Sequence, residues 1–458
     1  MLTKRLVTSL SLFGIILFSV SACATHGDIA EKPKTATAGL NIETWQTANG
    51  AKVFYVPAPQ LPMVDVRVVF NAGSARDGDK PGLASMTNTL LDHGAGNWNT
   101  NQIVDRFDSV GAQFSTDSLR DMAVVSLRTL TDKDWFNTAL DTMAVILQKP
   151  KFLKSELERE RQRTLVALRN QQESPSDLAD LAFYKALYQG QPYASPPLGT
   201  KESVSALTRQ DVEAFYKKYY VASNAIVVIV GAVDKTEASA IANKLMLPMQ
   251  KGEPAPVLPK VPDITEAKTV KQQHPSTQTT ILVGQIGETR TDPDYFPLYV
   301  GNHILGGSGF GSRIVDEIRE KRGLAYSSYS YFYPMEARGP FIMGLQTKNN
   351  QAKQALALLK KTVAKFIAEG PTPKEIDNAK KNITGGFPLR LDSNKEITEY
   401  VSMIGFYDLP LDYLKTFNAR VESVTRAQIM DAFKRRVHPD RMITVMVGDL
   451  DTADSKSK

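Results

Sequence analysis

An internal repeat constrains the fold of this chain more than any other feature of its 458 residues. Residues 208–234 read TRQDVEAFYKKYYVASNAIVVIVGAVD, and residues 425–451 read TRAQIMDAFKRRVHPDRMITVMVGDLD. The two copies align without a gap when Thr208 is placed on Thr425, and eight positions are then identical. Each copy predicts a capped amphipathic helix with a basic end, followed by a buried strand. Eight identities in one register indicate a duplicated ancestral domain.

The expected order of elements is similar in the two halves. Strand patterns precede most of the helix patterns in each half, and this order predicts α+β domains with a sheet covered on one face. The expected strands are 52–56, 63–71, 113–116, 122–129, 265–272, 279–285, 327–333 and 339–346. The expected helices begin at 82 and span 99–110, 135–148, 155–172, 176–188, 295–305, 312–322, 351–369, 373–384 and 397–407. We therefore predict two homologous α+β domains, each a mostly antiparallel sheet covered by helices.

Composition places the boundaries of these domains. Repeated prolines in residues 251–263 disfavour helix and favour extended chain, so this segment is the expected linker. The N-terminal domain is then 42–250, the C-terminal domain is 264–452, and 453–458 form a tail. Two such domains joined by a linker can enclose a cavity.

The N-terminus has the organisation of a secretory signal. Lys4 and Arg5 precede an apolar stretch over residues 6–20, which is short for a transmembrane anchor, and Val-Ser-Ala-Cys follows. The small residues before Cys23 resemble a bacterial lipoprotein box, which predicts a signal peptide over 1–22, lipidation of Cys23 and a polar tether over 23–41. Ala24 after the cysteine points to the outer membrane of a Gram-negative bacterium, facing the periplasm. An ordinary signal peptide cleaved nearby is the alternative.

Charge and motifs exclude several classes of function. The formal net charge is +6, and basic and acidic residues are interspersed, so nucleic-acid binding is not indicated. Cys23 is the single cysteine, so no disulfide can form within the chain. The sequence contains no G-x-S-x-G elbow and no C-x-x-C pair. The glycine-rich run 306–311 has no phosphate-binding lysine and does not follow a buried strand, so it is a weak phosphate signal.

The segment 305–333 carries the strongest functional pattern. A glycine-rich turn is followed by a predicted helix over 312–322, a stop at Gly323 and an aromatic-rich strand. Arg319 then lies near the end of the helix and Tyr326 at the start of the strand. Because only a tight turn separates them, a guanidinium and a phenol can meet over one groove and donate to a carbonyl oxygen. A solvated helix face and an ordinary strand tyrosine are the alternative interpretation.

The sequence REKRGLAY after a glycine-rich turn resembles the second-domain signature of the pitrilysin/insulinase metallopeptidases, a group that includes mitochondrial processing peptidase. The resemblance covers nearly the whole mature chain. It implies two α+β domains with the substrate between them. It also implies that Arg319 and Tyr326 hold the substrate backbone, with Gly306 and Gly307 of the glycine-rich loop in the same substrate-binding region.

The metal motif of that family is degenerate in this chain. Family members that cut peptides carry H-x-x-E-H on a helix of the first domain, with a third ligand, Glu, about 76 residues further on. The matching positions here are Ser85, Asn88, Thr89 and, near the third ligand, Val166. Ser, Asn and Thr are poor zinc ligands and Val cannot bind the ion, so we predict that this chain binds no metal or other cofactor.

Nearby residues are not expected to replace the motif. Asp92 and His93 are adjacent, and neighbours on a helix point in different directions, unlike an i, i+4 pair. Glu156, Glu158 and Glu160 alternate with arginines in a charged helix, which favours a solvated face over a ligand set.

Together these patterns predict the zinc-free subunit of a heterodimeric periplasmic metalloendopeptidase. A homologous partner would supply zinc and the general base, this chain would hold the peptide substrate, and its lipid would anchor the pair to the membrane. A catalytically inactive peptide-binding or scaffolding lipoprotein is the alternative. A self-sufficient peptidase with an unrecognised site is the third and least favoured hypothesis.

Overall fold

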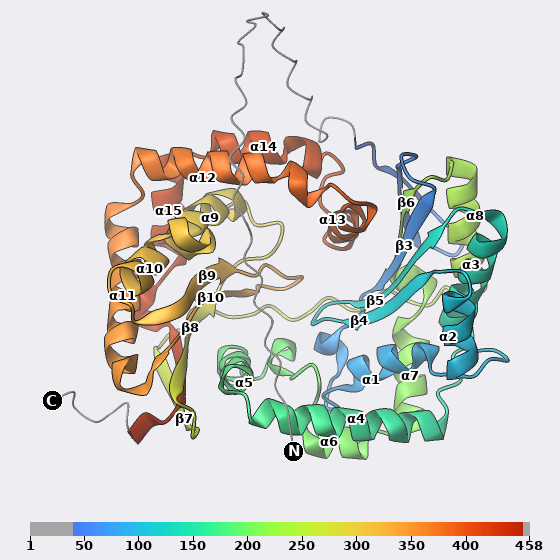
Figure 1. Cartoon of the computed structure of the whole chain (residues 1–458), viewed down its shortest axis with the longest axis horizontal. Helices are drawn as coiled ribbons and strands as arrows, with labels where there is room; N and C mark the ends of the chain where they lie inside the picture. Colours follow the sequence, from blue (N-terminus) through green and yellow to red (C-terminus); the bar gives the residue numbers. More distant parts are fainter. Residues whose placement is uncertain (1–39, 452–458) are drawn as a thin grey trace, which may run out of the picture. The chain divides into compact units, whose positions relative to one another are not determined.

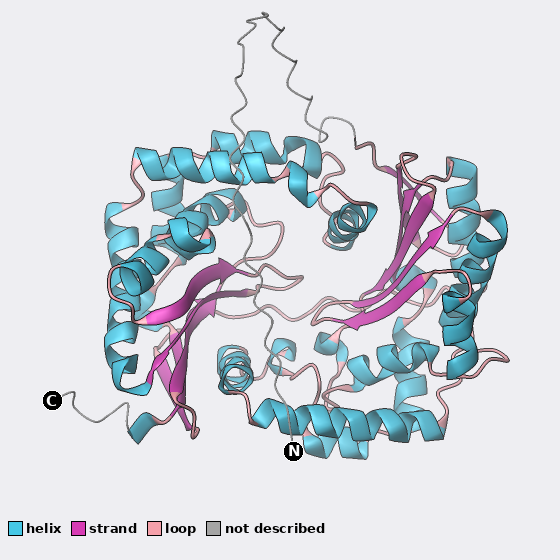
Figure 2. Cartoon of the chain, in the orientation of Figure 1, coloured by secondary structure: helices cyan, strands magenta, loops and turns pink. Residues whose placement is uncertain are grey.

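The computed structural model describes residues 40–451, which fold around two β-sheets flanked by helices (Figure 2). The predictions for the signal peptide, for Cys23 and for the 453–458 tail lie outside the described residues. Among the described helices, none combines the length and the apolar character needed to cross a membrane.

The two sheets share one topology. The first sheet has the order β1-β2-β6-β3-β5-β4 and the second the order β7-β11-β8-β10-β9. Apart from the extra edge strand β1, each strand of the first sheet has a counterpart at the same place in the second. In each sheet one pair is parallel, β2 with β6 and β7 with β11, and the remaining pairs are antiparallel. The prediction of two mostly antiparallel sheets is therefore confirmed.

The strands have the following bounds. Those of the first sheet are β1 Glu43–Gln46, β2 Lys52–Pro57, β3 Met63–Phe70, β4 Gln113–Ser118, β5 Ala123–Leu130 and β6 Ala225–Gly231. Those of the second sheet are β7 Lys268–Gln273, β8 Gln278–Ile286, β9 Ala325–Phe332, β10 Pro340–Lys348 and β11 Ile443–Gly448.

The helices divide between the halves in the same way. The first half contains α1 Leu83–Thr89, α2 Thr100–Asp108, α3 Lys133–Gln148, α4 Lys154–Gln172, α5 Pro175–Leu187, α6 Lys201–Ala206, α7 Arg209–Tyr219 and α8 Lys235–Met246. The second contains α9 Tyr295–Asn302, α10 Arg313–Val315, α11 Ala352–Glu369, α12 Pro373–Gly386, α13 Asn394–Phe406, α14 Tyr413–Ser423 and α15 Arg426–Arg436. The repeated segments form α7 with β6 and α15 with β11, and Thr208 and Thr425 each close a capping box at the start of the helix.

Each sheet is covered by helices on both faces, so the expectation of one covered face was wrong. On β6, Val227 and Ile229 pack into a core with α1, α3, α7 and α8, whereas Ile226 and Val228 face the opposite core, where α13 of the other half packs (Figure 1). In the second sheet α5 of the first half packs on β8 and β11 in the same way (Figure 1). A continuous apolar run such as that of β6 is typical of a strand buried on both faces.

The segment predicted as a linker contains no helix or strand, and it is held against the body of the protein. Leu258 and Val261 are buried, and the carbonyl oxygen of Pro256 accepts a hydrogen bond of 2.6 Å from Arg76 Nη1. Arg76 Nη2 also lies 3.1 Å from an oxygen of Glu336 in the second half. A buried guanidinium therefore ties the linker to both halves.

Candidate functional site

The glycine-rich segment and the residues after it differ from the predicted regular helix. Two five-residue π-helical stretches, His303–Gly307 and Asp316–Glu320, flank a 3-10 turn and the short helix α10. Lys321 N donates to Asp316 O at 3.0 Å, an i to i−5 bond, and Gly323 then adopts φ +58°. Wider turns of this kind are frequent at functional sites because they redirect side chains that a regular helix would place elsewhere.

This backbone brings Arg319 and Tyr326 together. The guanidinium carbon of Arg319 lies 4.6 Å from the centroid of the Tyr326 ring and 4.4 Å from that of Phe310. Tyr326 is 81% exposed, and Phe310 is also exposed. Cation–π attraction at these distances favours a guanidinium position close to both rings. The predicted meeting of guanidinium and phenol is confirmed, and their use in binding a substrate stays a prediction.

Phe310 is a member of this cluster that the sequence did not single out. It follows Gly309, whose φ of +65° is a conformation that favours glycine, and it forms part of the 3-10 turn. The sequence signal for Phe310 was a phenylalanine within a glycine-rich run. A glycine-rich turn has few apolar side chains to cover the ring, so an exposed ring is expected there.

Gly306 and Gly307 occupy different environments. Gly306 is buried against β9, where an added Cβ would lie 2.3 Å from Ser330 Oγ, so close packing accounts for the glycine. Gly307 is exposed, and a Cβ there would lie 3.0 Å from Asn302 Nδ2. Contact of these two glycines with substrate remains a prediction. Because Gly306 is buried, it could affect substrate binding only by positioning the residues beside it.

Arg313 anchors the start of α10. Its guanidinium donates to both carboxylate oxygens of Glu375 on α12, at 2.7 and 2.8 Å, and to the carbonyl oxygen of Gly370. The hydrogen bonds from Arg313 to Glu375, together with those from Thr372, lower the pKa of Glu375 to about 2 against the opposing effect of burial. A bidentate pair fixes orientation as well as distance, so the segment that carries Arg319 is tied to the helices behind it.

In the first half, Asn88 stands where the family motif has its catalytic Glu, and it has a structural role. Its Nδ2 donates to the carbonyl oxygens of Asp117 and Val124, at 2.8 and 3.3 Å. Its Oδ1 accepts from the Tyr220 hydroxyl at 3.0 Å. The side chain is 1% exposed. The amide is therefore committed to holding α1 against β4, β5 and the end of α7.

The other motif positions do not complete a ligand set. Ser85 and Thr89 lie on α1, while Val166 on α4 is 47% exposed and has no donor atom. Across residues 40–451, no three His, Cys, Asp or Glu side chains are grouped so that they could hold a metal ion. The donor chemistry at these positions does not fit the zinc site of the family.

Glu160 departs from the solvated face predicted for α4, since it is buried at 6% exposure. One of its carboxylate oxygens lies 3.6 Å from His93 Nδ1, and His93 Nε2 lies 3.8 Å from Asp92. The same Glu160 oxygen accepts a 2.7 Å hydrogen bond from Arg163 and lies 3.7 Å from Arg159. Two guanidinium groups thus compensate the buried carboxylate.

These observations define a duplicated α+β protein of the peptidase type in which the first half has lost the metal ligands and the second half presents an arginine–tyrosine pair. Family models agree with this class: "Insulinase (Peptidase family M16)" matches residues 52–201, and "Peptidase M16 inactive domain" matches residues 206–383. A crystal structure of a peptidase M16 inactive domain from Pseudomonas fluorescens is 38% identical and covers 89% of this chain and 98% of its own, with a TM-score of 0.87. The chain belongs to the insulinase family of peptidases, family M16.

Two further relatives span the same region. The non-peptidase homolog YmxG of Helicobacter pylori is 28% identical over 402 residues, which is 85% of this chain and 90% of that protein. The mitochondrial-processing peptidase subunit beta of Lentinula edodes is 25% identical over 439 residues, 91% of each chain.

Proposed function

We propose that this chain is the zinc-free subunit of a heterodimeric zinc metalloendopeptidase. One observation carries the proposal: Arg319 and Tyr326 are assembled, with Tyr326 exposed and Arg319 half-buried beside it, in a chain whose motif residues, Ser85, Asn88 and Thr89, do not fit a metal. The names of the relatives support it, since one is a non-peptidase homolog and another a peptidase subunit.

The role proposed for this chain is to bind and orient the peptide. Among the described residues, the Tyr326 hydroxyl has no hydrogen-bond partner, and the guanidinium of Arg319 has one polar contact, at 3.4 Å from its neighbour Glu320. Both groups are therefore free to donate to substrate carbonyl oxygens. The two aromatic rings favour one region for the guanidinium, and a donor placed in advance needs less reorganisation as charge develops on the carbonyl. Zinc and the general base would belong to a homologous partner subunit.

The proposal extends to location. The Val-Ser-Ala-Cys sequence ending at Cys23 supports a lipid anchor, and Ala24 after it supports the outer membrane, facing the periplasm. A labelled fatty acid incorporated into the parent but not into a Cys23→Ala variant would establish the anchor. Unchanged incorporation would exclude it.

The test is turnover by the assembled pair. Arg319→Ala and Tyr326→Phe are each expected to lower kcat/KM by roughly one to three decades, because each removes a donor to the reacting carbonyl. Co-elution of the two subunits on size exclusion should be unchanged, since neither side chain belongs to a hydrophobic core of this chain. Arg322→Ala and Tyr333→Phe are matched controls from the same region, and they should leave turnover close to that of the parent.

Unchanged turnover in both Arg319→Ala and Tyr326→Phe would rule out the substrate-holding role. Retained peptide binding with no cleavage in any combination of subunits would favour a peptide-binding or scaffolding lipoprotein.

A further inference from the structure

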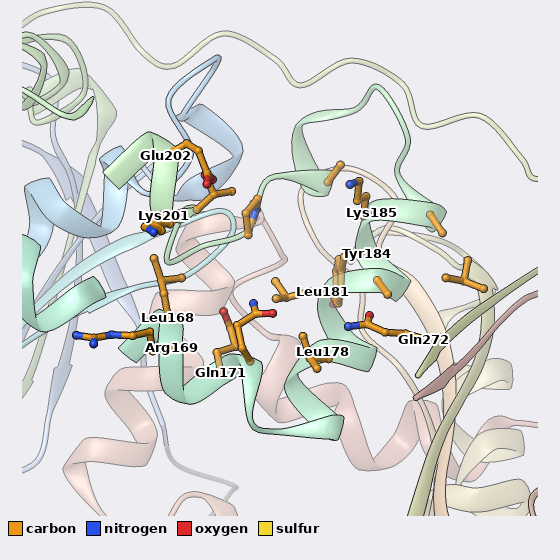
Figure 3. A pocket seen from close by; sticks show the side chains of 18 of the residues that line it. Leu168, Arg169, Gln171, Leu178, Leu181, Tyr184, Lys185, Lys201, Glu202 and Gln272 are labelled. Carbon is orange, nitrogen blue, oxygen red and sulfur yellow. The ribbon is translucent and has the colours of Figure 1, made fainter. Parts of the chain in front are cut away.

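A cavity of about 1160 Å³ lies away from the Arg319–Tyr326 pair, between α4, α5, the segment 194–202 and β7 (Figure 3). No residue of the segment 303–333 lines it. The volume exceeds the roughly 300–1,000 Å³ of sites that enclose small molecules, so it suits a stretch of polymer better than a metabolite.

The walls of the cavity are apolar. Leu178, Leu181 and Ala182 form a stripe along α5, and Leu165 and Leu168 of α4 face it. Figure 3 shows Leu178 and Leu181 directed from one wall and Leu168 from the other. Apolar side chains of a bound ligand would therefore be withdrawn from water.

The charged residues around these walls are mostly cationic. Positive charge comes from Arg120, Arg169, Lys185, Lys201 and Lys268. Among the described residues, Glu202 is the one carboxylate that lines the cavity. Arg120 is already engaged, since it stacks on Tyr184 at 3.6 Å and donates to two carbonyl oxygens. Arg169, Lys185 and Lys268 are exposed and have no ion-pair partner within the described part of the chain. An anionic ligand complements this surface.

The remaining lining suits a peptide backbone. Gln171 and Gln272 reach toward the cavity from opposite walls (Figure 3), and their amides can both donate and accept. Gln272 belongs to β7, an end strand whose described pairing is with β11 alone. The lining residues of β7, Lys268, Val270 and Gln272, alternate along the strand, so their side chains share the face turned to the cavity.

We propose that this cavity binds an extended polypeptide segment that carries both acidic and apolar side chains. The proposal rests on the proposed function in that the ligand is a peptide, and it names the class of peptide that this chain selects. The segment would engage the cavity at a distance from the bond held by Arg319 and Tyr326.

The experiment uses the full chain without a partner. Binding is measured by fluorescence anisotropy with a short synthetic peptide that alternates leucine and glutamate, and with a matched peptide that alternates leucine and lysine. The leucine–glutamate peptide should bind, and added salt should weaken it. Lys185→Glu combined with Lys268→Glu should weaken binding by roughly tenfold or more, because two attractive charges become repulsive.

Two control variants make the result specific. Lys374→Glu combined with Lys415→Glu changes the net charge equally but lies outside the cavity, so binding should be unchanged. Ala186→Trp adds bulk inside the cavity without changing charge and should also weaken binding. Circular-dichroism melts establish that each variant is folded.

Equal binding to the parent and to both cavity variants would overturn the proposal, as would equal binding of the leucine–lysine peptide. A cavity that takes oleate but not the peptide is a lipid site, and the proposal then fails as well. Loss of the cavity site is read from Lys185→Glu combined with Lys268→Glu in the binding assay, and loss of the Arg319 role from turnover by the assembled pair, so the two failures are distinguishable.

Discussion

At the scale of single residues, Glu288 is a buried carboxyl group at the junction after β8. It is 3% exposed, and its Oε2 atom has no hydrogen-bond partner within the described structure. Burial, and then the charge of Asp292, raise its pKa to about 8 against the opposing effect of Arg436 and Arg290. The folded protein therefore keeps Glu288 protonated at neutral pH, whereas the unfolded chain ionises it.

The sign of the resulting pH dependence follows from proton binding. Between about pH 4.5 and 8 the folded state holds a proton that the unfolded state has lost, so this group lowers the free energy of unfolding as pH rises through that window. Glu288→Gln removes the titration. We expect the variant to be more stable than the parent at pH 8 and to differ little at about pH 5, by urea denaturation.

An exposed carboxyl on the same half, Glu266, serves as the control, and Glu266→Gln should follow the parent at both pH values. A parent protein whose stability is level across this window, with Glu288→Gln parallel to it, would contradict a neutral buried Glu288.

At the scale of elements, α1 depends on the side chain that replaced the catalytic Glu of the family. Asn88→Ala leaves the Tyr220 hydroxyl and the carbonyls of Asp117 and Val124 without their partner. We expect the free energy of unfolding to fall by about 1–3 kcal/mol, the cost of leaving buried polar groups unsatisfied. Thr89→Ala on the same helix is the control and should change it by less than about 0.5 kcal/mol. Equal effects of the two substitutions would show that Asn88 has no special role.

The sequence predicted the two longest helices best, although no side chain of the described structure caps the start of either. Helices α4 and α11 begin and end within two residues of their predicted bounds. Helix α8 was missed, although Asp234 and Glu237 form a capping box at its start. The short edge strand β1 was missed too, because only four residues of alternating exposure carry its signal. The π-helical stretch that carries Arg319 could not be predicted, since apolar spacing does not distinguish an i−5 hydrogen bond from an i−4 bond.

The candidate site was also predictable only in part from the sequence. Arg319 and Tyr326 were predictable because seven residues and a glycine turn confine them to one region. The position of Phe310 could not be predicted, because it depends on a turn of unusual form. The burial of Glu160 could not be predicted either, because its neighbour His93 is distant in the chain. The sequence showed which metal ligands are missing, and only the structure shows what Asn88 does in their place.

At the scale of the whole molecule, the duplicated halves are interdependent. Each sheet is covered on one face by a helix of the other half, α13 or α5, and a buried network crosses between them. In that network Asp121 accepts hydrogen bonds from Tyr193 and Tyr407, at 2.5 and 3.0 Å. The packing of a helix from one half on the sheet of the other could not be predicted from either repeat alone, because it depends on how the two copies pack.

Under the proposed function the roles are divided between two chains, and this interdependence helps to keep the fold of the chain that lacks the metal ligands. A chain can lose the metal ligands of its first half and keep the fold, provided that residues such as Asn88 maintain packing. Its second half can then go on presenting Arg319 and Tyr326 to a peptide held against another subunit.

The most direct measurement is reconstitution with a zinc-bearing relative from the same genome. Zinc content and cleavage of a peptide library would be determined for this chain alone, for the partner alone and for the mixture. We predict that this chain alone binds no zinc and cleaves nothing, and that adding it to the partner raises cleavage in a way that Arg319→Ala abolishes. Zinc-dependent cleavage by this chain alone, or a partner whose activity is the same with and without it, would contradict the account.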